Sequence, residues 1–498
     1  MKKQACNPFL PLDTYIPDGE PHVFGDRVYL FGSHDKEAGN TYCMLDYMGW
    51  SAPTDDLSDW SCSGVIYSAG QDPLCSEKRP YLYAPDVVCG NDGKFYLYYC
   101  LAGFAGKGGY DGPIGVAVCD TPDGKYEYLG FVRHPDGSPY LRNILFDPAV
   151  INDSGTIRLY YGASMIIEPP PGPLGRELYY KAMEGIFSKT KEEIRTPPGI
   201  CGANEVELED DMLTVRGEAK RVLPGVCRGT GFEGHGFFEG ASIRRIGELY
   251  YLIYSSVHGH ELCYAVSRYP DRDFAFRGVI VSNGDIGLRG RKAKDRLNAT
   301  GNNHGSIEKI GDRWYVFYHR QTHGSDYSRQ ACAEPIEIRP DGAIEQVEMT
   351  SCGLNGGALR SEGEYPAVIC CNLTNGHMLP NGNRVSKWPQ PRISSADGER
   401  FVRNIGRGTW VGYKYFDFQN ISGVTLTLRG GAGSVAVYDA LHGKLLGSAN
   451  FSASERWRPV YVRLHAPNGK SALFFRFETK RQKTDFLKFA FETGEGGR

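Results

Sequence analysis

The chain has 498 residues, which at roughly 100 to 200 residues per domain indicates more than one domain. Hydrophobic residues make up 41% of the chain and charged residues 23%, a composition that supports packed cores and excludes a largely disordered protein. The net charge is -3 and the basic residues form no block, which argues against nucleic acid as a partner.

Several features bear on where the protein works. No apolar run approaches the roughly 18 residues of a membrane span, so we expect no membrane partner. The first residues, MKKQACNPFL, carry two lysines without an apolar stretch behind them, and we expect no secretion signal. The 14 cysteines are scattered without a CxxC metal spacing, which favours reduced thiols and a cytoplasmic location.

A repeated pattern in the first 350 residues predicts the architecture. Each copy is a glycine turn followed by an aromatic strand, and the starts are 68, 62, 92 and 64 residues apart. The copies are GDRVYLFG from Gly25, GKFYLYY from Gly93, GTIRLYYG from Gly155, GELYYLIY from Gly247 and GDRWYVFYH from Gly311. Five such units are typical of a five-bladed β-propeller, and the alternative is an all-β solenoid. The 92-residue gap predicts an insertion, beginning at the proline-rich stretch after Glu168.

A second, weaker repeat predicts an outer strand in each unit. An aromatic residue four positions before a glycine and two apolar residues occurs at Trp60, Tyr126 and Phe274. The pattern ends near Cys352, and after Phe401 short alternating strands separated by Gly, Asn and Pro turns predict a β-sandwich. We therefore expect an all-β protein with a propeller in 1–352, a linker in 353–380 and a sandwich in 381–498.

One polar residue occupies an equivalent place in every propeller unit, seven or eight positions before the repeat glycine. These residues are Asp18, Asp86, Asp147, Glu239 and His304. The first strand of each blade lines the central channel, so these side chains are expected to meet near the axis. Carboxyls gathered in a partly desolvated funnel cannot all ionise freely, which predicts an acid and a base on one wall. Such a pair is what inverting glycoside hydrolysis uses, although each acid taken alone could instead cap a loop or pair with an arginine.

At these residues the chain resembles glycoside hydrolase family 43, whose members are inverting five-bladed propellers acting mainly on arabinose- and xylose-containing polysaccharides. The resemblance covers about residues 7 to 350. The stretches that carry it are NPFLPLDTYIPDGEPHVFGDRVYLFGSHD, YLYAPDVV, LFDPAVINDSG, FFEGASIRRIGELYYLIYSS and TGNNHGSIEKIGDRWYVFYHR.

The resemblance implies the catalytic roles. Asp18 resembles the general base that activates water, Glu239 the general acid, and Asp147 the third carboxylate that raises the pKa of the acid and orients it. The sequence departs from the family at two places. Asp18 is not followed directly by proline, which leaves Glu20 as a rival base, and Ala241 stands where the acid motif commonly has proline.

The resemblance also implies residues around the substrate. Asp86 is expected near the sugar or capping a loop, and Arg329 is expected to pair with Asp147 or a sugar hydroxyl. His304 resembles an axial histidine that in several relatives binds a calcium ion or its water, so a structural calcium near His304 is expected and no cofactor is required for the chemistry. Independently of the resemblance, the flanking aromatic residues Trp50, Tyr83, Phe146 and Phe238 could stack on sugar rings or simply pack in the core. His235, four residues before Glu239, could contact the substrate or belong to a turn.

The C-terminal stretch GTWVGYKYFDF from Gly408 resembles carbohydrate-binding modules of family 6. Trp410, Tyr413 or Tyr415 could contact a glycan there, but the same residues could pack the core or the interface with the propeller.

The leading hypothesis is an inverting α-L-arabinofuranosidase or β-xylosidase that acts on short oligosaccharides. A glycan-binding propeller without activity and a glycosidase for another sugar, such as galactofuranose, remain alternatives. A fructosidase is disfavoured because its Asn-Asp-Pro-Asn stretch is absent from the sequence. The sequence leaves the oligomeric state, the sugar and the choice between exo and endo action open.

Overall fold

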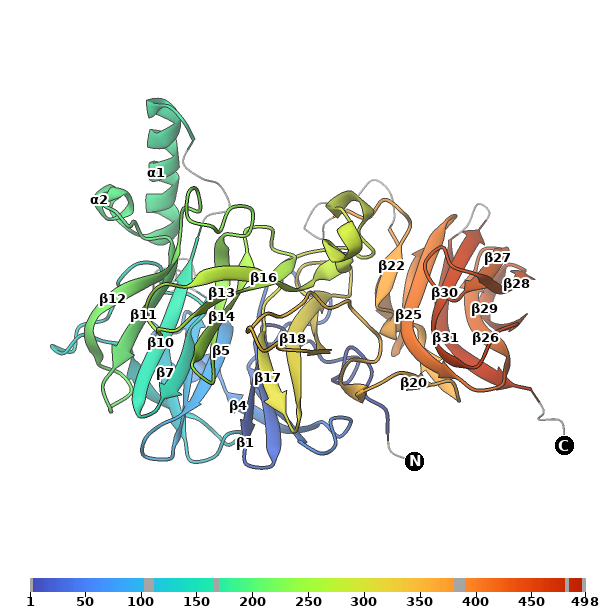
Figure 1. The fold of residues 1–498 in the computed structure, drawn as a ribbon, viewed down its shortest axis with the longest axis horizontal. Helices are drawn as coiled ribbons and strands as arrows, with labels where there is room; N and C mark the ends of the chain where they lie inside the picture. Colours follow the sequence, from blue (N-terminus) through green and yellow to red (C-terminus); the bar gives the residue numbers. More distant parts are fainter. Residues whose placement is uncertain (1–2, 103–111, 165–169, 380–389, 480–482, 495–498) are drawn as a thin grey trace.

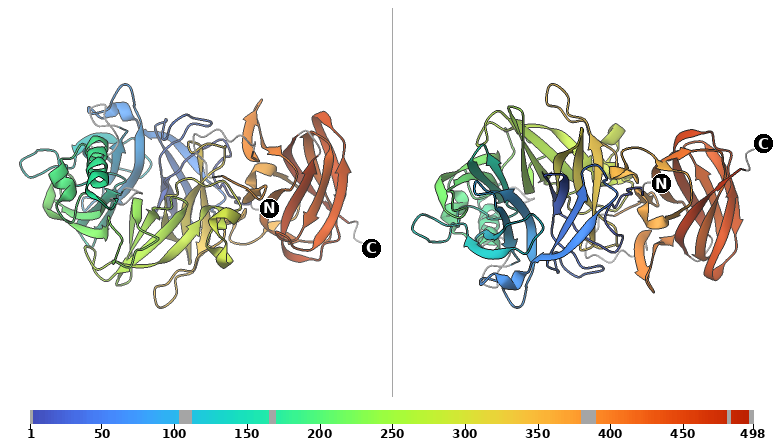
Figure 2. Two further views of the ribbon diagram at one scale, coloured as in Figure 1. Left: turned by 90° about the horizontal axis from the view of Figure 1, so that it is seen from above. Right: turned by 90° about the horizontal axis from the view of Figure 1, so that it is seen from below.

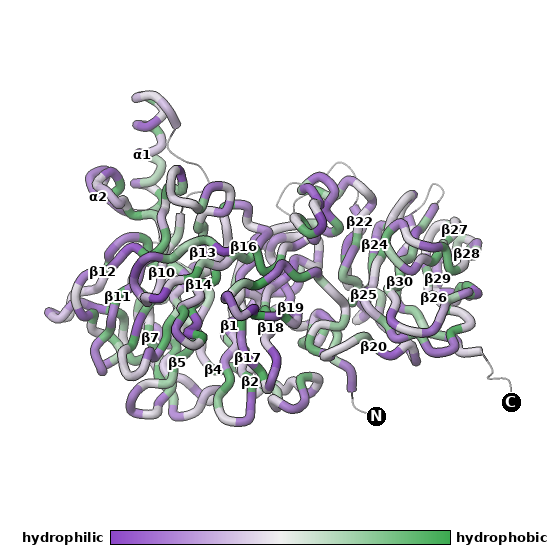
Figure 3. Tube along the Cα trace, viewed as in Figure 1, coloured by the Kyte–Doolittle hydropathy of each residue, from purple (hydrophilic) through white to green (hydrophobic). Residues whose placement is uncertain are grey.

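A computed structural model describes residues 3–102, 112–164, 170–379, 390–479 and 483–494. The described chain forms two β-rich bodies that lie side by side (Figures 1 and 2), with the N-terminal segment near the junction between them. Hydrophobic residues recur along the strands of both bodies, and hydrophilic residues gather in the connecting loops (Figure 3). Among the described residues, no helix is long and apolar enough to cross a membrane.

The larger body is a propeller of five antiparallel sheets, four with four strands and the last with three. Its strands, in chain order, are β1 (Glu20–Phe24), β2 (Arg27–Phe31), β3 (Tyr47–Pro53), β4 (Ser61–Tyr67), β5 (Leu82–Cys89), β6 (Phe95–Leu101), β7 (Gly115–Cys119), β8 (Glu127–Phe131), β9 (Ala149–Asp153), β10 (Thr156–Ala163), β11 (Gly202–Leu208), β12 (Val215–Pro224), β13 (Phe237–Ile246), β14 (Leu249–Ser256), β15 (Glu261–Ser267), β16 (Ala275–Ser282), β17 (Ser306–Ile310), β18 (Arg313–Gln321) and β19 (Arg329–Ile336). The first strands of the five blades contact one another in a closed ring, β1 to β5 to β9 to β13 to β17 and back to β1. The predicted propeller is therefore confirmed, and the first strands surround its axis.

Both sequence repeats correspond to blade strands. The glycine turns precede the second strands β2, β6, β10, β14 and β18, and the weaker repeat forms the outermost strands β4, β8 and β16. Gly64 and Gly278 lie beside register shifts in these outer strands with φ of 98° and 148°, a conformation that glycine adopts at little cost. The expected insertion contains α1 (Pro173–Phe187) and α2 (Lys191–Arg195) between β10 and β11. Its first residues, 165–169, lie outside the described part of the chain.

The N-terminal segment closes the ring between the first and last blades. The backbone N–H of Phe9 donates to the carbonyl of Ala331 in β19, and the Asn7 side chain donates to the carbonyl of Ala333. Phe9 and Leu10 pack into an apolar cluster shared by the two blades. Because the last blade has three strands, this extended segment covers its outer strand.

The smaller body is a sandwich of two sheets. One has the order β20-β25-β30-β27-β28 with β22 beside β25, and the other has the order β23-β24-β31-β26-β29 with β21 beside β31. Its strands are β20 (Leu359–Arg360), β21 (Glu364–Pro366), β22 (Asn372–Thr374), β23 (Arg392–Ala396), β24 (Glu399–Ile405), β25 (Thr409–Phe418), β26 (Ile421–Gly430), β27 (Gly433–Tyr438), β28 (Leu445–Phe451), β29 (Ser454–Arg463), β30 (Gly469–Thr479) and β31 (Thr484–Thr493). Short 3₁₀ turns complete the fold at Ala69–Gln71, Asn283–Asp285, Leu288–Gly290, Ala293–Asp295, Gly353–Asn355 and Ala367–Ile369.

The structure corrects the expected linker at 353–380. β20 and β22 pair with β25, and β21 pairs with β31, so this segment supplies edge strands to both sandwich sheets. Leu359, Tyr365 and Leu373 from it join the sandwich core. These strands could not be identified from the sequence, because each has only two or three residues and is too short to show an alternating apolar pattern.

Polar contacts tie the two bodies together. The Lys414 ammonium in β25 lies 3.0 Å from Asp285 Oδ2 and 3.1 Å from Glu348 Oε2 of the propeller. Arg320 of β18 donates to the backbone carbonyls of Cys370 and Cys371. Buried polar groups of both bodies thus find their partners across the junction, which fixes the relative placement of propeller and sandwich.

Candidate active site

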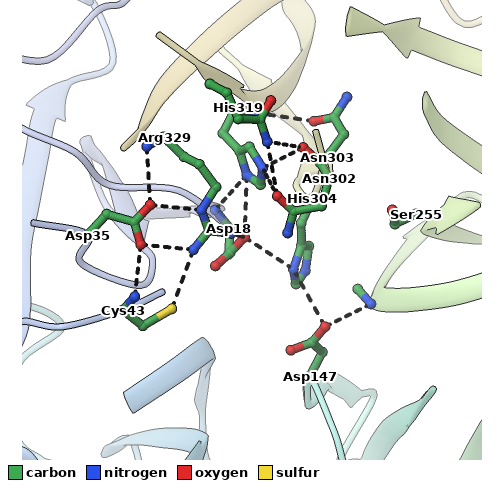
Figure 4. A network of polar contacts seen from close by, with 12 residues as sticks. Asp18, Asp35, Cys43, Asp147, Ser255, Asn302, Asn303, His304, His319 and Arg329 are labelled. Carbon is green, nitrogen blue, oxygen red and sulfur yellow. Dashed lines mark hydrogen bonds and ion pairs between the residues drawn. The ribbon is translucent and has the colours of Figure 1, made fainter. Parts of the chain in front are cut away.

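The sequence repeat positions converge at the start of the innermost strands. Asp18, Asp147 and His304 each lie two residues before β1, β9 and β17, and Glu239 lies within β13 at a register shift. Asp18 and Asp147 have positive φ, 56° and 46°, a conformation that aspartate tolerates better than most residues but that still stores strain. Figure 4 shows Asp18 and Asp147 on either side of the His304 ring.

Asp18 is held by an arginine. Nη1 of Arg329 donates to Asp18 Oδ1 at 2.7 Å, and the rest of the guanidinium forms a fork with Asp35, whose Oδ2 lies 2.8 Å from Nε and whose Oδ1 lies 3.0 Å from Nη2. All three side chains are buried. Burial alone would raise the pKa of Asp18, but the positive charge of Arg329 holds it below its usual value. Asp18 is therefore an ionised carboxylate at neutral pH.

The arginine is not where the resemblance places it. Arg329 was expected to pair with Asp147 or a sugar hydroxyl, but its hydrogen bonds go to Asp18 and Asp35. The ring of Tyr42 lies 4.8 Å from the guanidinium carbon and covers one face of it.

His319 supports Asp18 from the backbone side. Its Nδ1 accepts the backbone N–H of Asp18 at 3.1 Å, so the ring proton is on Nε2, which lies 2.9 Å from the carbonyl oxygen of Asn302. Burial, together with the charge of Arg329, lowers the pKa of His319 to about 3. His319 is therefore a neutral ring that fixes the strained backbone at Asp18 and does not take part in proton transfer.

Glu239 and Asp147, unlike Asp18, have raised pKa values. Burial and the nearby charge of Asp18 raise the pKa of Glu239 to about 7. Burial, followed by the charges of Glu239 and Asp18, raises the pKa of Asp147 well above its usual value. Asp147 Oδ2 accepts the backbone N–H of Gly240 at 3.0 Å, which ties it to the residue next to the acid. The two carboxyls thus retain a proton near neutral pH in the same pocket as an ionised Asp18.

His304 lies between the carboxylates. Its Nδ1 is 3.8 Å from Asp18 Oδ1 and 3.9 Å from Asp147 Oδ2. Burial lowers its pKa, so the ring is neutral at pH 7. These neighbours place oxygen atoms near His304, as an ion with a preference for oxygen ligands would require, but both carboxylates already accept protein hydrogen bonds.

The rival base, Glu20, belongs to another network. Its Oε2 accepts hydrogen bonds from Ser242 and Arg244, both at 3.1 Å, and burial together with the charge of Asp86 raises its pKa to about 8. A carboxyl that is largely protonated at neutral pH cannot serve as the ready base. The geometry and the charge state therefore favour Asp18 over Glu20.

Asp86 has a structural role instead of the expected place beside the substrate. It is fully buried, its Oδ2 accepts the backbone N–H of Val150 in the next blade, and its Oδ1 lies 2.6 Å from His22 Nε2. The contacts tie the innermost strands β5 and β9 together. This outcome matches the alternative of a carboxylate that satisfies backbone groups.

The aromatic and histidine candidates are divided. Tyr83 and Phe146 form an edge-to-face pair with ring centroids 5.6 Å apart, and Phe146 directly precedes Asp147, so both remain predictions for substrate contact. His235 does not join the carboxylates. Its Nδ1 lies 2.7 Å from Glu261, and its ring stacks on Phe276 of the outermost strand β16.

The two remaining aromatic candidates also differ in place. Trp50 is buried in the cluster between the first and last blades, which gives it a role in packing. Phe238 directly precedes the acid Glu239, and its backbone carbonyl accepts the N–H of Ser164, the residue that follows β10.

Three functional residues escaped the sequence reasoning. Asp35 positions Arg329, His319 positions Asp18, and the side chain of Asn302 hydrogen-bonds Glu239. All three lie in stretches that carry the family resemblance, GSHD, TGNN and FYHR. Their position beside repeat strands was a signal, but their partners are almost 300 residues away or more in two of the three cases.

Taken together, the site holds an ionised carboxylate and a carboxyl with a raised pKa in one cluster of buried side chains at the propeller axis. An ionised carboxylate can accept a proton from water, and a carboxylic acid with a pKa near 7 can donate one to a leaving oxygen. The arrangement is suited to acid- and base-assisted cleavage of a glycosidic bond.

Comparisons with known proteins agree with this chemistry. Residues 7–197 and 186–344 match the family profile described as "Glycosyl hydrolases family 43". The chain is 41% identical over 493 residues to a xylosidase/arabinosidase of Thermoclostridium stercorarium, covering 96% of this chain and 97% of the relative.

Solved structures give the same result for the fold. A family 43 β-xylosidase/α-arabinofuranosidase from a compost metagenome, in complex with xylotriose and calcium-free, is 26% identical, with a TM-score of 0.51 over 68% of this chain and 96% of that one. An arabinoxylan arabinofuranohydrolase of Bacillus subtilis, 20% identical with a TM-score of 0.50, shares the fold over 99% of both chains. The chain belongs to glycoside hydrolase family 43 and is a glycosidase that hydrolyses O-glycosyl bonds.

Proposed function

We propose that the protein is an inverting xylosidase/arabinofuranosidase that removes xylose or arabinose from short oligosaccharides. The names of its relatives support the sugar class, since the Thermoclostridium stercorarium protein is a xylosidase/arabinosidase. The observation that carries the reaction type is the opposite charge preference of Asp18 and Glu239 within one pocket.

In this mechanism the two carboxyls act on opposite sides of the scissile bond. Asp18, ionised beside Arg329, takes a proton from a water molecule that attacks the anomeric carbon. Glu239 gives its proton to the departing glycosidic oxygen, so that the bond breaks without forming an unstable alkoxide. The attack from the side opposite the leaving group inverts the configuration. Before the next cycle Asp18 releases the proton that it took to solvent, and Glu239 regains one from solvent.

Asp147 and Arg329 position the acid Glu239 and the base Asp18, respectively. Asp147 is tied to the backbone of Gly240, the residue after the acid, and so fixes the position of Glu239. Arg329 keeps Asp18 ionised and aligned through the fork to Asp35. We propose that a calcium ion, where present, would be held by His304 directly or through a water, and would supply positive charge that favours the ionised carboxylates.

The test is a panel of aryl arabinofuranosides, xylosides and galactofuranosides, with proton NMR of the first sugar released. We expect turnover of an arabinofuranoside or a xyloside and a product of inverted anomeric configuration. Asp18→Asn and Glu239→Gln are expected to lower kcat by about 10²- to 10⁴-fold. Glu20→Gln is the matched control, and it should retain most of the activity because the Glu20 carboxyl is not the base.

Each alternative predicts a different result. Affinity for sugars without hydrolysis of any aryl glycoside would support a non-catalytic glycan-binding propeller. Preferred turnover of a galactofuranoside would assign another sugar to the same site. A reducing, cytoplasmic location is also a proposal, supported by the buried thiols of Cys43, Cys100, Cys263 and Cys332.

A further inference from the structure

A second cavity lies outside the catalytic pocket, at the junction of propeller and sandwich. It has a volume of about 610 Å³, within the range of roughly 300 to 1,000 Å³ typical of ligand pockets. One wall is the loop of residues 285–297 in the propeller, and the other is the outer face of β25 and β30 in the sandwich. None of the catalytic carboxylates lines it.

The propeller loop that borders the cavity lies on the same edge of the propeller as the active site. The loop that forms its first wall connects β16 to β17 and ends at His304, which lies in the catalytic pocket. Figure 1 shows this loop, in yellow-green, directly beside β22 of the sandwich. A chain-like ligand held between the two bodies would therefore lie on the substrate side of the propeller.

The sandwich wall is aromatic because of strand alternation. In β25, Val411 and Tyr413 point into the sandwich core, so Trp410 and Lys414 lie on the opposite face. On this face Trp410, which is only 7% exposed, packs with Ala472 and Phe474 of β30 in a small buried cluster, and the partly buried Tyr415 lies beside it. The residue between them on this face, Gly412, has no side chain, and a Cβ there would meet the Phe474 ring at 2.2 Å.

This arrangement decides between the three aromatic candidates of the sequence. Tyr413 is fully buried, and its hydroxyl donates to the carbonyl of Ala367, so it cannot contact a glycan. Trp410 and Tyr415 both line the cavity. Sugar rings present flat C–H faces, which pack well against aromatic rings of this kind.

Charged residues of both signs line the cavity, most of them from the propeller. The cavity is lined by four basic residues (Arg289, Arg291, Arg296 and Lys414) and four acidic ones (Asp285, Asp295, Glu348 and Asp439). Within the described part of the chain, the buried Nε atoms of Arg291 and Arg296 have no hydrogen-bond partner. Lys414 already pairs with Asp285 and Glu348 across the junction. The remaining charged groups, three arginines with Asp295 and Asp439, carry both signs, which suits neutral hydroxyl groups better than a phosphate or a cation.

We propose that this cavity binds a neutral oligosaccharide, packed against Tyr415 and the part of Trp410 that lines the cavity, and hydrogen-bonded to the arginines of the 285–297 loop. For its choice of sugars the inference rests on the proposed function, but the site is separate from the catalytic pocket. The sandwich thereby contributes half of a second glycan site whose other half belongs to the propeller.

Calorimetric titration of the full chain tests the proposal. The Glu239→Gln variant, which preserves the ligand, is titrated with xylotetraose and with cellotetraose. We expect one of the two sugars to bind Glu239→Gln at two sites. In a Glu239→Gln/Trp410→Ala double variant, the association constant of one of these sites should fall at least tenfold. The single variant Trp410→Ala, with Glu239 intact, should hydrolyse an aryl glycoside at the wild-type rate.

Arg289→Ala provides a second variant, because Arg289 is exposed and its truncation leaves the sandwich core intact. We expect it to weaken the same site about tenfold, and it decides the matter if Trp410→Ala does not fold. A single site in Glu239→Gln for both sugars, or a second site indifferent to both substitutions, would overturn the proposal. Failure of the proposed function has a different signature, namely no hydrolysis of the aryl glycosides by the wild-type protein.

Discussion

Arg329 and Asp18 form a buried ion pair in which Nη1 lies 2.7 Å from Oδ1, although the two residues are 311 positions apart. Because Asp35 holds the remaining edge of the guanidinium, the arginine cannot turn away from Asp18. The pair sets the charge state of the base, and its loss should be visible in the pH dependence of the enzyme.

Replacing Arg329 by glutamine removes the positive charge shared by Asp18 and Asp35. The pKa of Asp18 should rise because burial is then no longer offset, and the acidic limb of kcat/KM should move up by at least one pH unit. We expect kcat to fall at least 100-fold, and Arg329→Lys to restore part of it. The pH–rate profile with an aryl glycoside measures both effects.

The matched control is Arg320→Gln, since Arg320 is also buried but donates to backbone carbonyls at the domain junction. It should lower thermal stability without moving the acidic limb. An unchanged acidic limb in Arg329→Gln would contradict the role assigned to the ion pair.

The wild-type enzyme should show a bell-shaped profile of kcat/KM. On the alkaline side activity falls as Glu239 loses its proton, with an apparent pKa of about 7. On the acidic side activity falls only below about pH 4, because the pKa of Asp18 lies below its usual value of about 3.9. Full activity at pH 9 would mean that Glu239 is not the proton donor.

Gly240 connects the acid to the rest of the site, and Gly240→Ala should damage it. Its φ of 69° disfavours any side chain, and a Cβ would lie 2.9 Å from Cγ of the His304 ring. We expect a loss of about 1 to 2 kcal/mol in unfolding free energy from the backbone and at least a tenfold loss of kcat from the displaced His304. Thermal unfolding and steady-state kinetics measure the two effects.

Gly247→Ala separates the effect of backbone strain from the effect of the contact with His304. Gly247 has a similar φ of 61°, but no atom lies within 4 Å of the added Cβ. It should lose stability alone. Equal kinetic losses in the two variants would show that backbone strain, and not the contact with His304, controls the activity.

Arg400 of the sandwich is expected to be a positioning residue that acts on the catalytic loop, residues 32–46 between β2 and β3, which carries Asp35. Its Nη2 donates to Glu37 Oε2 at 2.8 Å, and Glu37 also accepts a hydrogen bond from the Tyr15 hydroxyl at 3.1 Å. Glu37 lies two residues after Asp35 in the chain. Arg400→Ala should lower kcat several-fold, with partial rescue in Arg400→Lys, while thermal stability changes little because the pair is partly exposed.

Arg458→Ala, at an exposed position of β29, is the control and should leave kcat unchanged. Equal activity of Arg400→Ala and wild type would show that the sandwich does not influence the catalytic loop.

The sequence allowed the blades and three carboxylates to be predicted because both follow a local period. A glycine turn and an aromatic strand recur in every blade, and an offset of seven or eight residues from that turn locates Asp18, Asp147 and Glu239. The same offset gave Asp86 equal weight, yet its carboxylate is used up by the backbone of the next blade. An offset reports position along a strand, and the partner across the blade decides the role.

The sequence by itself thus determined the periodic part of the protein: the five blades, the all-β sandwich, and the protein family whose motifs contain the catalytic carboxylates. Only the tertiary structure decided which groups meet, including Arg329 with Asp35, His319 with Asp18, and Trp410 with the propeller loop. The physical reason is that charge states and cavities depend on burial and on contacts between residues hundreds of positions apart, and such contacts leave no spacing to be read along the chain.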